Sequence, residues 1–545
     1  MAEVARGSTM NLVGAVISAL TTIAVTVLVT RLFSPPVAGA FFSATSLFLI
    51  IESVATLGAY AGAVYFIARL RVLGEDRRIP VVLRAAIIPV TVASVTGAVT
   101  LFVYGTPLAR LLLSSHLGHS ETSISSVATA LRALAVTLPF AAIMDTLLGA
   151  TRGYRDMRPS VAINQISRSL VQLAGVAMAA TTARAALLAP LWALPYLPAA
   201  AAAWIWLLRI RRHAADRAPR RPISPELASP PTLAASVTAG STRLTSGHAY
   251  SDERLRNVNA RSFWRFTAPR ALAVTAQIIV QRIDIVLVAI LRGPAEAAIY
   301  TAATRFLVVG QMGNVAISMA AQPQLTELFA MSARDRVNVM YQATTAWVIL
   351  LLWPLYLLIL INGQQFLGIF GHSYQAGDTV LVILSLSMLL STACGQVDVV
   401  LITAGRSSWS LVNGLLAMVV NVGLDLILIP RLGIAGAALG WAAAITVANL
   451  MPLAQIAITA RLSPFGRGTA VACGLCLISF GAIPLAIRFL LGAGPAGILC
   501  GAAVGTAVMA AGLWRFRHPL RLSVMPGLSR LARRRLQLGA TGWGM

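Results

Sequence analysis

Arginine side chains lie inside long apolar segments of this 545-residue chain, where they could hold a charged solute. A charge at membrane depth costs at least ~2.5 kcal/mol on insertion scales, so such residues usually face a cavity or pair internally. A guanidinium group stays charged and can bind phosphate oxygens through two parallel hydrogen bonds. The set therefore favours an anionic solute over an organic cation, which would be expected among acids and aromatic rings. Its members are Arg132, Arg168, Arg270, Arg282 and Arg305.

Two of the apolar segments carry several polar residues on one helical face. Asn164, Arg168 and Gln172 are spaced four residues apart, which places them on a single face. A second face carries a polar stripe roughly 21 Å long, whose members fall within about 60° of one another. That stripe comprises Arg270, Gln277, Gln281 and Asp284. We expect both faces to line a cavity.

Carboxylates in the same segments could couple transport to a proton or sodium gradient. Asp284 and Glu52 are the candidates, because each lies well inside an apolar segment. Glu52 could instead neutralise Arg132 or Arg168. Asp145 lies close to a segment end, from which its side chain could reach water. No metal site and no cofactor are expected, and the absence of a GxxxxGK[ST] phosphate-binding loop argues against ATP.

Fourteen apolar stretches, each long enough to cross a bilayer, must position these residues. The chain is 57% hydrophobic and 11% charged, with a mean hydropathy of +0.78, which excludes a soluble domain. The fold class is therefore an all-α membrane protein with fourteen transmembrane helices. The predicted spans are residues 9–31, 38–67, 81–103, 124–149, 158–182, 186–208, 265–291, 295–321, 338–361, 377–404, 407–429, 432–459, 468–487 and 493–514.

The distribution of arginine predicts the orientation. All 43 basic residues are Arg, and about 32 of them fall in segments that would share one side of the membrane, against about six on the other. Positively charged loops stay in the cytoplasm, so both termini are expected there. The exclusive use of Arg and the abundance of Ala suggest a GC-rich genome. We therefore expect a multi-pass protein of a bacterial cytoplasmic membrane.

The chain divides into two similar halves. Pro36 aligns with Pro294 and Phe48 with Phe306, while residues 147–152 (LLGATR) match residues 401–406 (LITAGR). Six spans separate the matches, which implies two parallel six-helix lobes around a central cavity, the geometry of an alternating-access carrier. The predicted domains are an N-lobe at 1–209, a disordered basic cytoplasmic linker at 210–263, a C-lobe at 264–460, two extra spans at 461–515 and a basic cytoplasmic tail at 516–545.

Two segments carry a distinctive arrangement of buried polar residues, turns and small residues. Residues 281–306 (QRIDIVLVAILRGPAEAAIYTAATRF) carry a buried Asp, a short turn containing Gly and a Tyr that opens the next helix. Residues 421–440 (NVGLDLILIPRLGIAGAALG) carry an Asn, an Ile-Pro exit and a small-residue entry. The pattern is similar to the superfamily that joins Wzx-type polysaccharide flippases, the lipid II flippase and the MATE multidrug exporters, known as the MOP superfamily.

This resemblance implies a two-lobed flippase that moves a polyprenyl-pyrophosphate-linked oligosaccharide to the outer leaflet for assembly of a surface polymer or cell wall. Arg168, Arg270 and Arg305 would then bind the pyrophosphate, with Arg132 and Arg282 as further candidates. Asn164, Gln277 and Gln281 would contact sugar hydroxyls. The partners implied are the lipid-linked glycan, membrane lipids and a cytoplasmic regulator that could bind the linker or tail; nucleic acid is not expected.

Several other functions remain open. A lipid II flippase is the nearest alternative, although that branch has basic residues on the cavity faces of spans one and two, where this chain has Asn11, Ser18, Thr22 and Glu52. A cation-coupled multidrug exporter of the same fold is another. A membrane glycosyltransferase would need clustered external carboxylates, which the short external loops lack, so an enzyme is not expected. A scaffold that recruits cytoplasmic partners is the last alternative.

Overall fold

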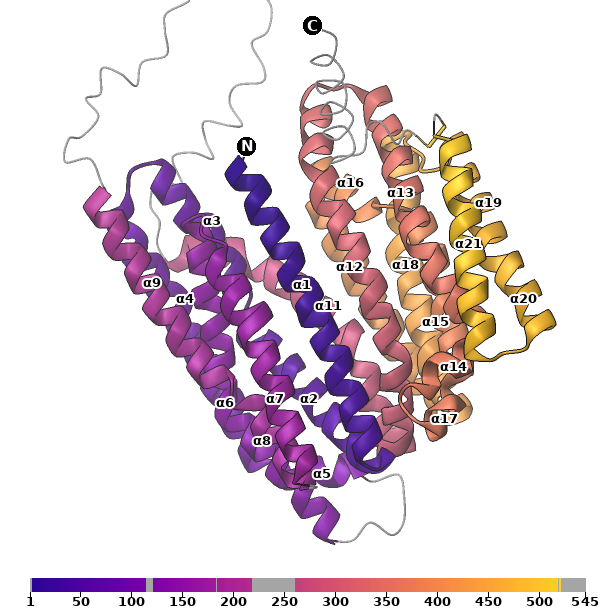
Figure 1. Cartoon of the computed structure of the whole chain (residues 1–545). Coiled ribbons are helices and arrows are strands. Elements are labelled where there is room, and N and C mark those ends of the chain that lie inside the picture. Colours follow the sequence, from indigo (N-terminus) through magenta and orange to yellow (C-terminus); the bar gives the residue numbers. More distant parts are fainter. Residues whose placement is uncertain (1, 114–120, 183, 218–259, 518, 521–545) are drawn as a thin grey trace, which may run out of the picture.

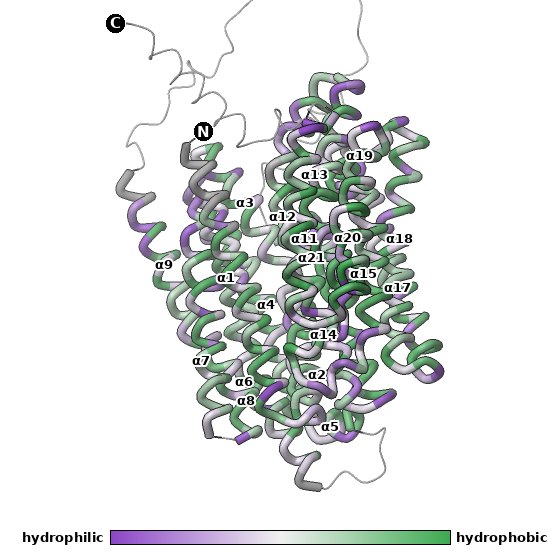
Figure 2. The backbone as a smooth tube through the Cα atoms, turned by 45° about the vertical axis from the view of Figure 1, so that its right-hand side comes forward, coloured by the Kyte–Doolittle hydropathy of each residue, from purple (hydrophilic) through white to green (hydrophobic). Residues whose placement is uncertain are grey.

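The computed structural model describes residues 2–113, 121–182, 184–217, 260–517 and 519–520. Within these ranges the chain is almost entirely helical and contains no strand. A helix is what an apolar segment must form inside a bilayer, because there every backbone N–H and C=O group has to be satisfied within the protein. Figure 2 shows that the helices are mostly hydrophobic along their length.

The first half of the chain forms the helices α1 to α9. Two 3₁₀ turns, at Asp76–Arg78 and Ala185–Leu187, lead into α4 and α8. The helices are α1 (Ala2–Leu32), α2 (Pro35–Ala55), α3 (Ala59–Val72), α4 (Ile79–Val103), α5 (Gly105–Leu113), α6 (Glu121–Gly153), a π-helix (Ser160–Ser167) that continues into α7 (Arg168–Thr181), α8 (Leu188–Ala193) and α9 (Tyr196–Arg217).

The second half forms α11 to α18, and α19 to α21 follow. The helices are α11 (Ala260–Arg292), α12 (Pro294–Ala330), α13 (Arg334–Ile361), α14 (Gly363–Gly368), a 3₁₀ turn (His372–Gly377), α15 (Asp378–Ala393), α16 (Val397–Thr403), α17 (Ser407–Leu432), α18 (Ile434–Ala460), α19 (Arg467–Cys476), a π-helix (Leu477–Ala482), α20 (Ile483–Leu491) and α21 (Pro495–Arg515).

Several predicted spans are broken rather than continuous. The second span bends between α2 and α3, where Leu57 and Gly58 have φ angles of 49° and 64°. The tenth bends between α15 and α16 at Gly395, whose φ is 70°. Helix breaks at membrane depth are tolerated where they line a cavity or are covered by protein, which is the usual situation in transporters.

Twelve helical segments of the described chain are long and apolar enough to cross a membrane, against the fourteen predicted. The two predicted spans outside this set are residues 158–182 and 295–321. Both are helical, as the π-helix with α7 and as α12, but they carry Arg168 and Arg305 together with several amides. The full count of fourteen spans stays a prediction. The two helices outside the set carry polar side chains in the middle of their sequences.

The two halves lie side by side, with α19, α20 and α21 on the outer edge of the second half (Figure 1). Helix α11 connects them, because it packs against α2 and α3 of the first half and against α17 of the second. The first turns of α11 pack closely against α3 at Gly62, where an added Cβ would lie 2.3 Å from Thr267 Oγ1. Small residues at such positions let two helix backbones approach closely.

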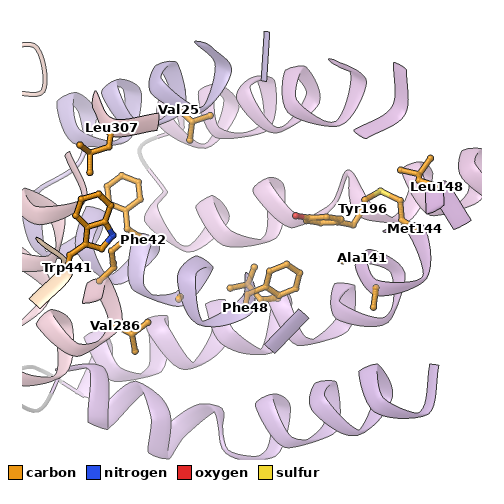
Figure 3. Close-up of a cluster of buried hydrophobic side chains, with 14 of the residues drawn as sticks. Val25, Phe42, Phe48, Ala141, Met144, Leu148, Tyr196, Val286, Leu307 and Trp441 are labelled. Atoms are coloured by element: carbon orange, nitrogen blue, oxygen red, sulfur yellow. The ribbon is translucent and has the colours of Figure 1, made fainter. Parts of the chain in front are cut away.

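The larger of two buried apolar clusters in the described chain runs through both halves. Figure 3 shows Phe42 of α2 beside Leu307 of α12 and Trp441 of α18. The backbones are in contact near the starts of α2 and α12, where a Cβ on Gly39 would lie 1.6 Å from the Pro294 carbonyl oxygen. At the same end Arg31 donates from Nε to the Ile369 carbonyl oxygen at 2.7 Å. The two halves are therefore joined at this end.

The described helices extend into the predicted linker from both sides. Helix α9 continues to Arg217 and α11 begins at Ala260, so residues 210–217 and 260–263 are helical rather than linker. Residues 218–259, and residues 521–545 of the predicted tail, lie outside the described ranges. The start of that tail contacts α13, where Trp347 Nε1 donates to the Leu520 carbonyl oxygen at 3.2 Å.

Candidate functional site

A cavity of about 280 Å³ lies between the two halves of the chain. Its first-half wall comes from α1, α2, α7, α8 and Tyr196 at the start of α9, and its second-half wall from single residues of α11 and α12. Three arginines line it: Arg168 from the first half, and Arg282 and Arg305 from the second. Guanidinium groups from both halves therefore converge on one space.

Arg168 is held by the residues of its own helix and by α9. Its Nε donates to Asn164 Oδ1 at 2.7 Å, and its Nη1 donates to Gln172 Oε1 at 3.0 Å and to Tyr196 Oη at 3.2 Å. Gln172 is itself fixed, because its Nε2 donates to the Trp192 carbonyl oxygen at 3.1 Å. The predicted face of Asn164, Arg168 and Gln172 is thus one connected network that aims a guanidinium at the cavity.

Arg282 and Arg305 have a different environment. Arg305 is only 6% exposed, and its Nε has no hydrogen-bond partner among the described residues. Arg282 lies close enough for the two positive charges to repel each other. Within the described chain neither forms an ion pair, since the pairs found there join Arg78 to Glu75 and Arg292 to Glu296. Two positive charges therefore lie at the cavity wall with no carboxylate paired to them in the described chain. An anion bound between them would reduce their repulsion.

Polar groups of α1 form the opposite wall. Ser18, Thr22 and Thr26 line the cavity, and the Ser18 hydroxyl lies 3.2 Å from that of Ser169 on α7. The two threonines donate to carbonyl oxygens one turn earlier, at 2.8 and 2.9 Å. Their oxygen lone pairs remain available as acceptors, so this wall can receive hydroxyl groups of a solute.

Glu52 and Asp145 lie next to each other in the first half, within hydrogen-bonding reach, and both are near Arg168. Both residues are half-buried. The sequence left open whether Glu52 neutralises Arg132 or Arg168, and the arginine near it is Arg168. Asp145 was expected to reach water from the end of its span, whereas it faces Glu52. Two adjacent carboxyl groups repel when both are ionised, so the pair can share a proton.

Four of the eight residues predicted to bind the cargo lie away from this cavity. Arg132 donates from Nη2 to Thr106 Oγ1 at 3.0 Å and lies over the Phe102 ring, which places it against α4 and α5. Arg270 lies over the Phe266 ring, 3.7 Å from its centroid, in a groove beside α3. Gln277 and Gln281 are exposed and are not part of the cavity wall. The members of the stripe predicted along α11 therefore do not share one environment, and they do not line one cavity together.

The fourth member of that stripe, Asp284, belongs to a buried acidic cluster in the second half. Tyr300 donates to Asp284 Oδ2 at 2.6 Å, and Asn421 Nδ2 donates to Asp425 Oδ2 at 3.2 Å. The two carboxyl groups are within hydrogen-bonding reach of each other, and Asp284 and Asp425 are 3% and 0% exposed. Gly440 leaves room for Asp425, since a Cβ there would lie 2.1 Å from Oδ1.

Three buried oxygens of this cluster have no hydrogen-bond partner among the described residues: Asp284 Oδ1, Asn421 Oδ1 and Asp425 Oδ1. An unpaired buried acceptor costs free energy, which a bound cation or proton would recover. Oxygen atoms of carboxylates and amides suit a hard cation. The sequence singled out Asp284, whereas Asp425, Asn421 and Tyr300 needed the fold to be recognised, because the cluster draws on three different helices.

One family model and several solved structures match this chain. The MatE family model matches residues 269–427, from α11 into α17. No curated protein matches the chain. The structure described as "Lipid II flippase MurJ, inward closed conformation" superposes with a TM-score of 0.68 at 11% identity, covering 94% of this chain and 98% of that one.

Two further solved structures share the fold. A multidrug resistance MATE family transporter of the MOP superfamily, in an inward-facing conformation, gives a TM-score of 0.61 at 16% identity and covers 82% of this chain and 94% of its own. A MOP superfamily transporter from Pyrococcus furiosus, described as having a binding pocket of reverse polarity, gives 0.53 at 16% identity over 84% and 95% of the two chains. The chain is therefore a multi-pass membrane protein with the fold of the MOP superfamily of flippases and exporters.

Proposed function

We propose that this protein is a flippase that moves a polyprenyl-pyrophosphate-linked oligosaccharide from the inner to the outer leaflet by alternating access. The product would serve assembly of a cell-surface polysaccharide or cell wall, and the protein would lie in a bacterial cytoplasmic membrane with both termini in the cytoplasm. The observation that carries the proposal is the convergence of Arg168, Arg282 and Arg305 on one cavity between the two halves.

The chemistry of the cavity favours a phosphorylated cargo. Arg282 and Arg305 repel each other without a cargo, so a pyrophosphate between them would replace repulsion with charge-assisted hydrogen bonds. Arg168 would add a third guanidinium from the opposite half. The hydroxyl groups of Thr22 and Thr26 would meet sugar hydroxyls, and Asn164, which accepts from Arg168 Nε, would orient that guanidinium group. Arg132, Arg270, Gln277 and Gln281 are not assigned a role in cargo binding.

Coupling to a cation gradient is proposed for the acidic cluster of Asp284, Asp425 and Asn421. A sodium ion or proton bound there would satisfy the unpaired oxygens. Because Asp284 belongs to α11 and α11 also packs against the first half, binding at the cluster would act on the helix that joins the halves. Glu52, paired with Asp145, is the second candidate for taking up a proton.

Two alternative cargoes share this fold. A lipid II flippase would use the same pyrophosphate chemistry, and the solved structure named for that activity aligns with nearly the whole chain. A cation-coupled multidrug exporter is suggested by the MatE match and by the MATE transporter structures. Three arginines in the cavity disfavour organic cations. The Pyrococcus furiosus transporter, for which reverse pocket polarity is said to suggest a different function, is a precedent for this reasoning within the fold.

A reconstituted flipping assay tests the proposal. Proteoliposomes would hold a fluorescent polyprenyl-pyrophosphate-linked oligosaccharide or fluorescent lipid II, and a membrane-impermeant quencher would report transfer between leaflets. We expect wild-type protein to flip the oligosaccharide lipid and the double variant R282M/R305M to be inactive. Arg132→Met is the matched control and should remain active, since Arg132 lies outside the cavity.

The outcomes separate the cargoes. Transfer of lipid II alone would replace the polysaccharide cargo by the peptidoglycan precursor. Accumulation of a cationic dye that depends on Asp284 or Glu52, without transfer of either lipid, would establish the exporter instead. Full activity of R282M/R305M would remove the arginines from the mechanism.

A further inference from the structure

A second basic site lies outside the central cavity, in a groove between α3 and α11. The groove encloses about 660 Å³ and is lined by residues of α3, by Arg155 in the loop after α6, and by Phe266 and Arg270 of α11. Its guanidinium groups belong to Arg69, Arg155 and Arg270, and its described lining contains no carboxylate. None of these residues takes part in the proposed cargo binding.

The charged rim of the groove is held in place by aromatic rings. Arg270 lies 3.7 Å from the centroid of the Phe266 ring and donates from Nη1 to the Phe266 carbonyl oxygen at 3.0 Å. Phe266 stacks on Tyr65 of α3, with centroids 4.1 Å apart and an angle of 19° between the rings. Arg69 donates to Tyr65 Oη at 3.4 Å. The stacked pair thus fixes guanidinium groups from α3 and α11 on one rim.

Arg155 is presented by an unusual backbone conformation. Its φ is 62°, a region that non-glycine residues seldom occupy, and its N–H donates to the Arg152 carbonyl oxygen at 2.8 Å. The side chain is exposed, and in the described chain neither Arg155 nor Arg270 forms an ion pair with a carboxylate. Two guanidinium groups at the groove therefore have no counter-charge among the residues that the structure describes.

The floor of the groove is apolar and continues along the helix. Ala61, Val64, Ala68 and Val72 recur at the spacing of one face of α3, so small side chains leave a channel beside Tyr65. A soluble anion would need the arginines and have no use for this floor. A phosphate group with an attached acyl chain would use both, and basic pockets between helices on the cytoplasmic side are where anionic lipid headgroups bind.

We propose that the groove between α3 and α11 binds an anionic phospholipid of the cytoplasmic leaflet. Its phosphodiester would lie among Arg69, Arg155 and Arg270, and one acyl chain would lie along the apolar face of α3. Because α3 belongs to the first half and α11 continues into the second, the bound lipid would hold α11 against the first half. This inference does not depend on which cargo the central cavity carries.

The test is native mass spectrometry of the full-length protein titrated with phosphatidylglycerol or phosphatidylcholine of identical chains. Wild type should bind phosphatidylglycerol preferentially at one tight site. A basic residue near an anionic membrane surface contributes about 1 kcal/mol, so Arg155→Gln or Arg270→Gln should weaken that site roughly fivefold, and the double variant roughly thirtyfold. Arg270→Lys keeps the charge but loses the guanidinium group that lies over the Phe266 ring. It should retain most of the affinity, which would show that the charge of residue 270, and not its contact with Phe266, accounts for the loss in Arg270→Gln.

Arg406→Gln is the matched control, because Arg406 also lies over an aromatic ring, 4.6 Å from the Trp409 centroid, but is outside the groove. It should leave the affinity unchanged. Equal binding of the two lipids by wild type, or equal affinities of wild type and R155Q/R270Q, would overturn the proposal. Displacement of the lipid by equimolar glycerol phosphate would reassign the groove to a soluble phosphate ester. Preference for a polyprenyl phosphate over phosphatidylglycerol would make it a cargo entry site instead.

Discussion

Replacing Arg305 by Met should stabilise the protein without cargo and weaken cargo binding. The side chain is 6% exposed, its Nε lacks a partner among the described residues, and Arg282 lies beside it. A buried polar group left unsatisfied costs about 1–3 kcal/mol, and methionine fills a similar volume without a charge. The free energy of unfolding of the cargo-free protein should therefore increase by an amount in that range.

The same substitution removes charge-assisted hydrogen bonds to a bound pyrophosphate. Hydrogen bonds to charged groups contribute about 1.5–3 kcal/mol, so the Kd for pyrophosphate should rise roughly 10- to 150-fold. A thermal-shift assay measures both effects. Wild type should gain thermal stability when inorganic pyrophosphate is added, and Arg305→Met should begin higher and gain little.

Arg168→Met is the informative comparison. That arginine donates to Asn164, Gln172 and Tyr196, so its loss leaves three acceptors unpaired and should lower stability by about 2–4 kcal/mol. The two arginines should thus shift the melting temperature in opposite directions. If Arg305→Met melts below wild type and still responds to pyrophosphate, Arg305 is a structural residue and the reasoning is wrong.

Three further predictions concern the surroundings of the cavity. Asp425→Asn should abolish any stabilisation by sodium in the same thermal assay, and a sodium response that persists would separate the acidic cluster from coupling. Gly39→Ala should destabilise the protein by about 1–3 kcal/mol, because a Cβ there meets the Pro294 carbonyl oxygen at 1.6 Å. Gly423→Ala faces open space inside α17, so in the same unfolding measurement it should leave the stability unchanged or raise it by up to about 1 kcal/mol. Arg132→Met should leave the affinity for pyrophosphate unchanged in a binding titration, and a marked loss would place Arg132 in the cargo site after all.

Much of the architecture could be predicted from hydropathy, because apolar runs of about 20 residues must become helices in a bilayer. The helix breaks were not visible in the same way. Gly58 and Gly395 each lie in an apolar run that also contains other glycines. Only the fold shows which glycine of a run adopts a left-handed conformation. The helices that carry Arg168 and Arg305 fall outside the apolar set because these arginines and other polar residues, only some of which line the cavity, lower their hydropathy.

The candidate site was predicted unevenly for a physical reason. The face of Asn164, Arg168 and Gln172 is local, so helical periodicity alone found it. The stripe on α11 failed because α11 meets α3 at its start and the acidic cluster further along, and one helical face therefore passes through different environments.

The acidic cluster could not be predicted, because its residues come from segments far apart in the sequence. The two segments that resembled flippases, residues 281–306 and 421–440, contain Asp284 and Tyr300 in one and Asn421 and Asp425 in the other. Their resemblance could be read from the sequence, but their contact could not. It depends on the packing of α11, α12 and α17, and more than a hundred residues separate the end of α11 from the start of α17.

The most direct test of the central claim is competition at the cavity itself. Purified wild-type protein and R282M/R305M would be titrated with a labelled polyprenyl-pyrophosphate-linked oligosaccharide in the presence of inorganic pyrophosphate or of a cationic dye. The account predicts that wild type binds the lipid, that pyrophosphate and not the dye displaces it, and that the variant binds it far more weakly. Displacement by the dye, together with undiminished binding by the variant, would contradict the account.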